Sequence, residues 1–149
     1  MADILNNKKA LRDYHILETF EAGIALHGTE VKALRAGKGQ IADSFARVEN
    51  DEVWLHNAHI DEYAQGNIAN HEPDRDRKLL LHRREIDSLL GKTRERGLTL
   101  VPTRLYFKDG KVKVEVALAR GKEQRDKRRD IADRDAKRQV ERALKERRL

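Results

Sequence analysis

The sequence contains no cysteine, which excludes disulfide bonds, thiolate metal sites, iron–sulfur clusters and a cysteine nucleophile. It also lacks any run that approaches the roughly 18 apolar residues of a membrane-spanning helix. The N-terminal stretch MADILNNKKALRDY has no apolar segment of signal-peptide length. We therefore expect a cytoplasmic protein that is neither secreted nor inserted into a membrane.

Residues suited to catalysis or metal binding are few or poorly placed. The serines, Ser44 and Ser88, do not lie in a G-x-S-x-G or S-x-x-K motif. Among six scattered histidines, His56 and His59 are close, but three residues apart in an expected strand they point to opposite faces. The carboxylates are interleaved with Lys and Arg, as on a solvated surface. We predict no catalytic residue, metal site or cofactor, and hence a protein that is not an enzyme.

Charge divides the 149 residues into two parts. Residues 1–119 carry 19 basic and 19 acidic side chains, whereas residues 120–149 carry 13 and 7, so the whole net charge of +6 lies in the last thirty residues. All seven aromatic residues precede residue 108. We expect a folded body over residues 1–120 and a basic tail over residues 121–149, with Gly121 as the hinge. A polyanion, with nucleic acid as the leading candidate, is the expected partner.

Alternating hydrophobic residues predict antiparallel strands in the body. One strand runs from Lys111 to Ala119, and a second, from Leu98 to Phe107, precedes it across an Asp-Gly turn that favours a hairpin. Because proline cannot donate a ladder hydrogen bond, Pro102 predicts a bulge or an edge.

A second hairpin is expected from Ile41 to Val48 and from Val53 to Ile60, and an opening strand from Tyr14 to Leu26. Two short helices are predicted between these strands. Thr29 caps the first, which Gly37 ends within the turn RAGKGQ, and the second contains Ile86, Leu89 and Leu90 and ends at Gly97. This pattern predicts a mainly β (α+β) fold, a small closed or nearly closed antiparallel barrel with two or three flanking helices.

Basic side chains able to contact phosphates form several clusters along the chain. A charge-coated surface without a binding role is the alternative for any one of them. The clusters are Lys8, Lys9 and Arg12; Arg75, Arg77 and Lys78; Arg83 and Arg84; and the tail.

Several strings resemble the small protein B (SsrA-binding) family, in this order and spacing: GTEVKALRAGK, RKLLLHRREI and ALARGK. The resemblance covers nearly the whole chain. It implies an oligonucleotide-binding-like barrel that binds the tRNA-like domain of transfer-messenger RNA and delivers it to stalled bacterial ribosomes. Elongation factor Tu is then an indirect partner through the charged RNA. The RNA-facing positions that it implies here are Asn7, Glu21, Leu80 and Lys113.

The resemblance also implies that the tail enters the empty mRNA channel near the decoding centre. From the residues themselves we expect the tail to be disordered when free, because its apolar stripe includes only two large side chains for docking on the body, and helical on the ribosome. The chain departs from the family at Glu123, where Lys is common, and at Arg125, where His or another ring is common; the Arg125 guanidinium can still stack. The implied ribosome-binding residues are Gly121, Lys122, Arg125, Asp126, Lys127, Arg128, Lys137 and Arg138.

Two other functions stay open on the residues alone. A general single-stranded nucleic-acid-binding barrel needs solvent-facing aromatic residues, and we expect Phe45, Trp54 and Phe107 to serve the core instead. A small ribonuclease that uses a His and a Lys is the second alternative.

Overall fold

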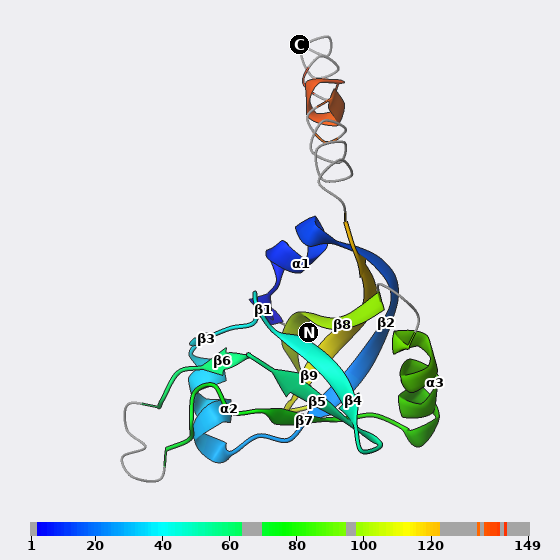
Figure 1. The fold of residues 1–149 in the computed structure, drawn as a ribbon. Helices are drawn as coiled ribbons and strands as arrows, with labels where there is room; N and C mark the ends of the chain where they lie inside the picture. Colours follow the sequence, from blue (N-terminus) through cyan, green and yellow to red (C-terminus); the bar gives the residue numbers. More distant parts are fainter. Residues whose placement is uncertain are drawn as a thin grey trace.

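The computed structural model describes residues 3–63, 70–94 and 98–122 and, further along the chain, residues 134, 136–140 and 142. Between residues 3 and 122, the described residues form nine strands and three short helices, and residues 136–140 are also helical (Figure 1). The helices are α1 (Lys8–Asp13), α2 (Gly28–Arg35) and α3 (Arg83–Thr93). The strands are β1 (Asp3–Asn6), β2 (Tyr14–Ile24), β3 (Gly39–Gln40), β4 (Phe45–Glu49), β5 (Glu52–His56), β6 (His59–Ile60), β7 (Arg77–Leu80), β8 (Leu98–Lys108) and β9 (Lys111–Gly121).

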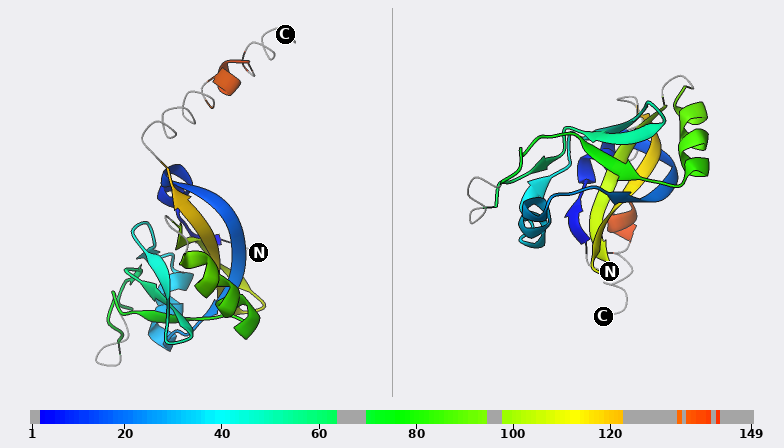
Figure 2. Two further views of the ribbon diagram at one scale, coloured as in Figure 1. Left: turned by 45° about the vertical axis from the view of Figure 1, so that its right-hand side comes forward. Right: turned by 90° about the horizontal axis from the view of Figure 1, so that it is seen from below.

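The main sheet closes on itself. Its strand order is β1-β8-β4-β5-β7-β2-β9, and β8 also pairs with β9, so six strands form a ring with β1 attached to β8. The pairings are antiparallel. Closure removes the free edges that would otherwise invite pairing with other chains. Figures 1 and 2 show the three helices around the outside of this ring. The predicted small antiparallel barrel with flanking helices is therefore confirmed.

The β8–β9 hairpin is the longest pairing and forms as predicted. Its turn places Asp109 and Gly110 at φ 52° and 75°, the positive values that a tight hairpin turn needs. The register shifts between Pro102 and Arg104, which is the predicted bulge. Beyond residue 119, β9 continues to Gly121, which pairs with Tyr14 of β2. Gly121 is therefore the last residue of a paired strand and not a hinge.

The second hairpin is also present, with shorter strands than predicted. Its turn contains Asn50 and Asp51 at φ 49° and 62°. Residues 41–44 form a turn before β4, in which the Ser44 hydroxyl donates to the Ile41 carbonyl at 2.6 Å. At the other end, Asn57 with φ 62° separates β5 from β6. β6 pairs with β3 in a small second sheet, so a single strand to Ile60 was wrong.

Each helix packs one apolar patch against the barrel. Leu34 of α2 and Leu89 of α3 are at most 1% exposed and belong to the main core. Ala10 of α1 lies in a smaller cluster with Ala117 and Ala119 of β9. In the described part of the chain, no helix has the length and apolar character required to cross a membrane.

The helix ends correct one prediction and support another. The N-cap of α2 is His27 and not Thr29, whose hydroxyl lies 2.8 Å from Nδ1 of His71. Gly37, at φ 70°, ends α2 as predicted, and its N–H donates to the Leu34 carbonyl at 2.9 Å. α3 ends at Thr93, and Gly97 lies outside the described residues.

Candidate nucleic-acid interface

A groove of about 630 Å³ opens between β2, β7 and β9 at the end of the β8–β9 hairpin. We call it the hairpin groove. It brings together Glu21, Leu80 and Lys113, three of the residues expected to face RNA, from three strands that are far apart in the sequence. Its walls also include aliphatic side chains and the start of α3, namely Ile24, Leu26, Val31, Leu81, His82 and Glu85. The groove therefore joins an apolar surface to charged groups, as a site for an unstacked base and its phosphates requires.

The apolar part of the groove depends on Leu80. Its side chain is 52% exposed, so this leucine is not part of the core. The alternation along β7 explains why: Leu79 points inward and is 1% exposed, which turns Leu80 outward. An exposed leucine beside cationic groups provides a surface against which the face of a base can pack.

The cationic part of the groove comes from β9. Lys113 pairs in register with Gly23 of β2, and Lys111 lines the same groove near the hairpin turn. Neither lysine forms an ion pair with any described residue, whereas many other basic side chains of the body do. Both ammonium groups are therefore available to a phosphate.

Glu21 is held by partners that the sequence did not indicate. The Tyr106 hydroxyl donates to its Oε2 at 2.6 Å, and Nζ of Lys108 donates to Oε1 at 3.2 Å. These hydrogen bonds, the one from Tyr106 first, lower the pKa of Glu21 below its usual value. Tyr106 is 2% exposed, and burial together with the Glu21 carboxylate raises its pKa to about 12. Glu21 is thus an ionised hydrogen-bond acceptor in a fixed position, suited to a base-edge N–H or a 2′-hydroxyl.

A second group of predicted residues lies on α1, at the other end of β2. Tyr14 follows α1 directly, and Glu21, seven residues further along β2, lines the hairpin groove. At about 3.3 Å per residue of strand, α1 and the groove are therefore roughly 20 Å apart. Lys8 is exposed, Lys9 binds Asp43 at 2.5 Å, and Arg12 lies 3.2 Å from Asp13. These contacts are exposed and weak, so phosphate can compete for the cations.

Asn7 differs from the expectation for an RNA-facing residue. It is 2% exposed and is the N-cap of α1, where its Oδ1 accepts the Ala10 N–H at 3.0 Å. Its Nδ2 donates to the carbonyls of Ile41 and Pro102 at 3.1 and 2.8 Å. The amide therefore fixes α1 on the barrel, and the neighbouring lysines, not Asn7, are presented to solvent.

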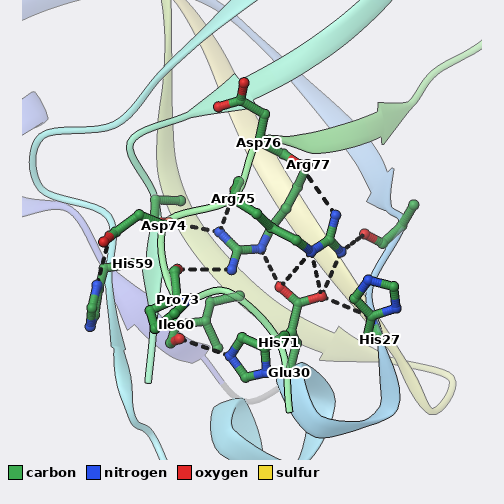
Figure 3. A network of polar contacts seen from close by, with 12 residues as sticks. His27, Glu30, His59, Ile60, His71, Pro73, Asp74, Arg75, Asp76 and Arg77 are labelled. Carbon is green, nitrogen blue, oxygen red and sulfur yellow. Dashed lines mark hydrogen bonds and ion pairs between the residues drawn. The ribbon is translucent and has the colours of Figure 1, made fainter. Parts of the chain in front are cut away.

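Within the cluster Arg75, Arg77 and Lys78, the two arginines do not form the phosphate-binding patch that the sequence suggested. Glu30 and Arg77 are both fully buried, and Nε of Arg77 donates to Oε2 of Glu30 at 2.5 Å. Arg75 donates to the same carboxylate, also at 2.5 Å (Figure 3). Lys78, by contrast, lies 3.1 Å from Glu52. The two arginines thus attach α2 to the first residue of β7 and to the segment just before it.

The Glu30 carboxylate stays ionised in this buried setting. Burial by itself would raise its pKa, but hydrogen bonds from Arg75, the His27 N–H and Arg77 outweigh that effect, and the pKa lies below the usual value. Arg77 also donates to the carbonyls of Ala58 and Pro73, at 2.7 and 3.0 Å. This network is structural.

The remaining predicted residues have less definite surroundings. Arg83 and Arg84 are exposed at the start of α3, and Arg83 lies 3.3 Å from Asp87. In the tail, the N–H of Lys122 donates to the Asp13 carbonyl at 2.8 Å. Lys137 and Arg138 are helical and exposed. Gly121 ends β9, whereas Arg125, Asp126, Lys127 and Arg128 lie outside the described residues.

The aromatic residues correct another expectation. Phe107 packs against the main core, as predicted. Phe45 and Trp54 belong neither to the core clusters nor to the side chains packed against them. They lie on the outer surface of β4 and β5, where the inward positions are taken by Ala46, Val53 and Leu55.

A closed antiparallel barrel with a partly apolar, partly cationic groove defines the class of small nucleic-acid-binding barrels of the oligonucleotide-binding type. The chain belongs to the SmpB protein family, whose model matches residues 4–146. It is 60% identical over 144 residues to the SsrA-binding protein of Pelotomaculum thermopropionicum, covering 97% of this chain and 94% of that one. It is 64% identical over 141 residues to the SsrA-binding protein of Acidothermus cellulolyticus, covering 95% and 89%.

The fold is also similar to a chain in a solved structure. That structure is described as "tmRNA-SmpB: a journey to the center of the bacterial ribosome". The two chains are 55% identical with a TM-score of 0.69, and the match covers 83% of this chain and 87% of the other.

Proposed function

We propose that this chain is an RNA-binding adaptor that binds the tRNA-like domain of transfer-messenger RNA and delivers it to stalled ribosomes in the cytoplasm. Elongation factor Tu joins this assembly through the charged RNA. The observation that carries the proposal is the hairpin groove, in a chain whose relatives are SsrA-binding proteins. Its role is binding, without a catalytic step or a cofactor.

Within the groove the residues have separate roles. Lys113, assisted by Lys111, contacts phosphates, while Leu80 packs under an unstacked base. Glu21 accepts a hydrogen bond from a base edge or a 2′-hydroxyl, because an ionised carboxylate would repel a phosphate at the same place.

The α1 end and the tail serve the ribosome. Lys8, Lys9 and Arg12 extend the cationic surface, and Lys122 leaves the barrel beside α1. Residues 121–149 then occupy the empty mRNA channel and the decoding centre, with Lys137 and Arg138 on rRNA phosphates and Arg125 stacked on a base. Because β2 separates α1 from the groove by roughly 20 Å, both RNAs can be held at once.

The test is the binding of a tRNA-like-domain transcript to full-length protein at several salt concentrations. Lys113→Ala should weaken binding and lower the slope of log K against log salt by about 0.7 to 0.9, the contribution of one phosphate contact. Lys38→Ala is the charge-matched control, since Lys38 is exposed and forms no ion pair with any described residue. Equal losses for the two variants, or no binding by the wild type, would contradict the proposal.

A further inference from the structure

Apart from Leu80 in the hairpin groove, the outer surface of β4, β5 and β7 has no role in the function proposed so far. Trp54 lies at its centre. Val53 and Leu55, its neighbours along β5, are 0% and 1% exposed and fill the core, so the alternation of the strand turns Trp54 outward. The indole is partly exposed and packs against neither core cluster. The chain therefore places its largest aromatic side chain on the surface of the barrel.

Cations flank this ring in the sheet. Trp54 pairs in register with Arg47 of β4 on one side and with Lys78 of β7 on the other. Residues paired across neighbouring strands share one face, so the three side chains form a row. Arg47 is exposed and forms no ion pair with any described residue; its guanidinium lies 5.2 Å from the centre of the Phe45 ring.

The acidic groups near the row are already bound. Glu52 lies 3.1 Å from Nζ of Lys78. Glu49 and Asp76 each lie 2.9 Å from a ring nitrogen of His56, which itself stacks on Phe45 with the ring centres 5.3 Å apart. Arg47, which is exposed and has no ion-pair partner among the described residues, is thus the cation of this surface most accessible to a phosphate.

The row is continuous with the hairpin groove. Lys78 and Leu80 are two residues apart in β7, so they share the outer face, and Leu80 lines the groove. Nucleic acid that enters the groove at Leu80 needs only to follow β7 to reach Lys78 and Trp54. Because the register neighbours of Trp54 are cations, the surface is not the apolar patch that a hydrophobic protein partner requires.

We propose that Trp54, Arg47 and Lys78 form a second contact for the RNA that occupies the hairpin groove. An unstacked base of that RNA packs on the indole, and the flanking phosphates lie at Arg47 and Lys78. Aromatic side chains beside cations bind single-stranded segments in this way, since every base has a π-face. This inference rests on the proposed function for the identity of the RNA.

The direct test uses the intrinsic fluorescence of full-length protein, because Trp54 is the only tryptophan in the chain. The tRNA-like-domain transcript should quench it and protect it from acrylamide, with the same midpoint as binding followed through a label on the RNA. Binding without any change at Trp54 overturns the second contact and leaves the groove intact. Absence of binding rejects the proposed function itself.

Variants give an independent result. Trp54→Ala should weaken RNA binding by about tenfold, equivalent to about 1.4 kcal/mol, and Trp54→Phe by less because a ring remains. Arg47→Ala should lower the salt slope by about 0.7 to 0.9, whereas Arg35→Ala, an exposed arginine of α2 that loses the same charge, should not. Thermal melting checks the fold, and Arg47→Ala decides the matter if Trp54→Ala does not fold.

Two further outcomes count against the inference. If Arg47→Ala and Arg35→Ala weaken binding equally, the effect is general electrostatics. If purified ribosomes protect Trp54 from acrylamide and the transcript alone does not, this surface serves the ribosome and not the RNA of the groove.

Discussion

Gly23 in β2 lies directly beside Leu80 in β7, and a Cβ atom built on Gly23 would be 3.2 Å from Cβ of Leu80. On its other side Gly23 pairs with Lys113 of β9. The missing side chain therefore leaves the space between the apolar and the cationic part of the hairpin groove open. Since Leu80 is half-exposed, this space is a feature of the binding surface and not of the core.

Gly23→Ala should therefore weaken RNA binding more than it affects stability. The added methyl group displaces Leu80 by a few tenths of an ångström, while alanine in a strand regains about 0.5 to 1 kcal/mol of backbone entropy. We expect a loss of affinity of about threefold to tenfold and a nearly unchanged melting temperature. Gly91→Ala is the control, because nothing lies within 4 Å of a Cβ at that exposed helical position. An unchanged affinity in Gly23→Ala would show that the space is not used.

Tyr106→Phe tests whether the tyrosine hydroxyl positions Glu21. The ring and its contact with the Arg104 guanidinium, 4.5 Å away, are retained, and the hydrogen bond to Glu21 is lost. We expect RNA affinity to fall by about fivefold, equivalent to roughly 1 kcal/mol for one hydrogen bond. In a Glu21→Gln background the same change should have a much smaller effect, which a double-mutant cycle measures.

A matched variant separates positioning from stability. Thr103→Val removes a hydroxyl from the same strand that donates to Glu115 at 2.5 Å, and Glu115 does not line the groove. Thr103→Val should change the melting temperature without changing the affinity for RNA. Additive effects of Tyr106→Phe and Glu21→Gln would mean that the tyrosine acts on binding by another route.

Glu30→Gln should lower the free energy of unfolding of the barrel far more than the removal of an exposed charge does. It leaves Arg77, which is fully buried, without its countercharge, and breaking one partner of a buried pair costs about 3 to 5 kcal/mol. Glu52→Gln, from an ion pair with Lys78 in which both side chains are 41% exposed, should cost less than about 1 kcal/mol. Urea unfolding at neutral pH measures both, and similar losses would contradict the structural role of Glu30.

The pH dependence of Glu30 has a definite sign. Its folded-state pKa lies below the usual value of 4.5, so the folded form binds the proton more weakly than the unfolded chain does. The stabilisation is complete above pH 4.5 and is lost as the pH falls through the lowered pKa. The difference in unfolding free energy between wild type and Glu30→Gln should therefore shrink in acid.

Local patterns account for much of the fold. The alternation in β9 and the Asp-Gly turn follow from residue properties within a few positions, and so does the end of α2 at Gly37. The split between β5 and β6 does not, because it depends on Asn57 adopting a positive φ and on β3 pairing with β6. The alternation of apolar residues from Val53 to Ile60 by itself predicts one strand.

The site was predictable only in part for the same reason. The run of leucines around Leu80 does not show which of them faces the core, and only the structure shows that Leu79 is buried and Leu80 exposed. The charges of Arg75 and Arg77 suggested phosphate binding, but their partner Glu30 is more than 40 residues away in the sequence. Tyr106 is 85 residues from Glu21, and no local signal connects them.

The tail gives the last prediction, on the described residues 136–140, which are helical and exposed. Proline inside a helix costs about 3 kcal/mol relative to alanine, and glycine about 1 kcal/mol. Because these side chains are exposed, Ala136→Pro should leave the melting temperature of the barrel and its affinity for the tRNA-like RNA unchanged. The readout is a reconstituted translation assay that measures how many nascent chains on stalled ribosomes receive a tag from transfer-messenger RNA. If the ribosome requires a helical tail, this tagging should decrease strongly for Ala136→Pro and slightly for Ala136→Gly. Wild-type tagging by the proline variant would rule out the helical requirement, and a marked drop in melting temperature would mean that the tail stabilises the barrel.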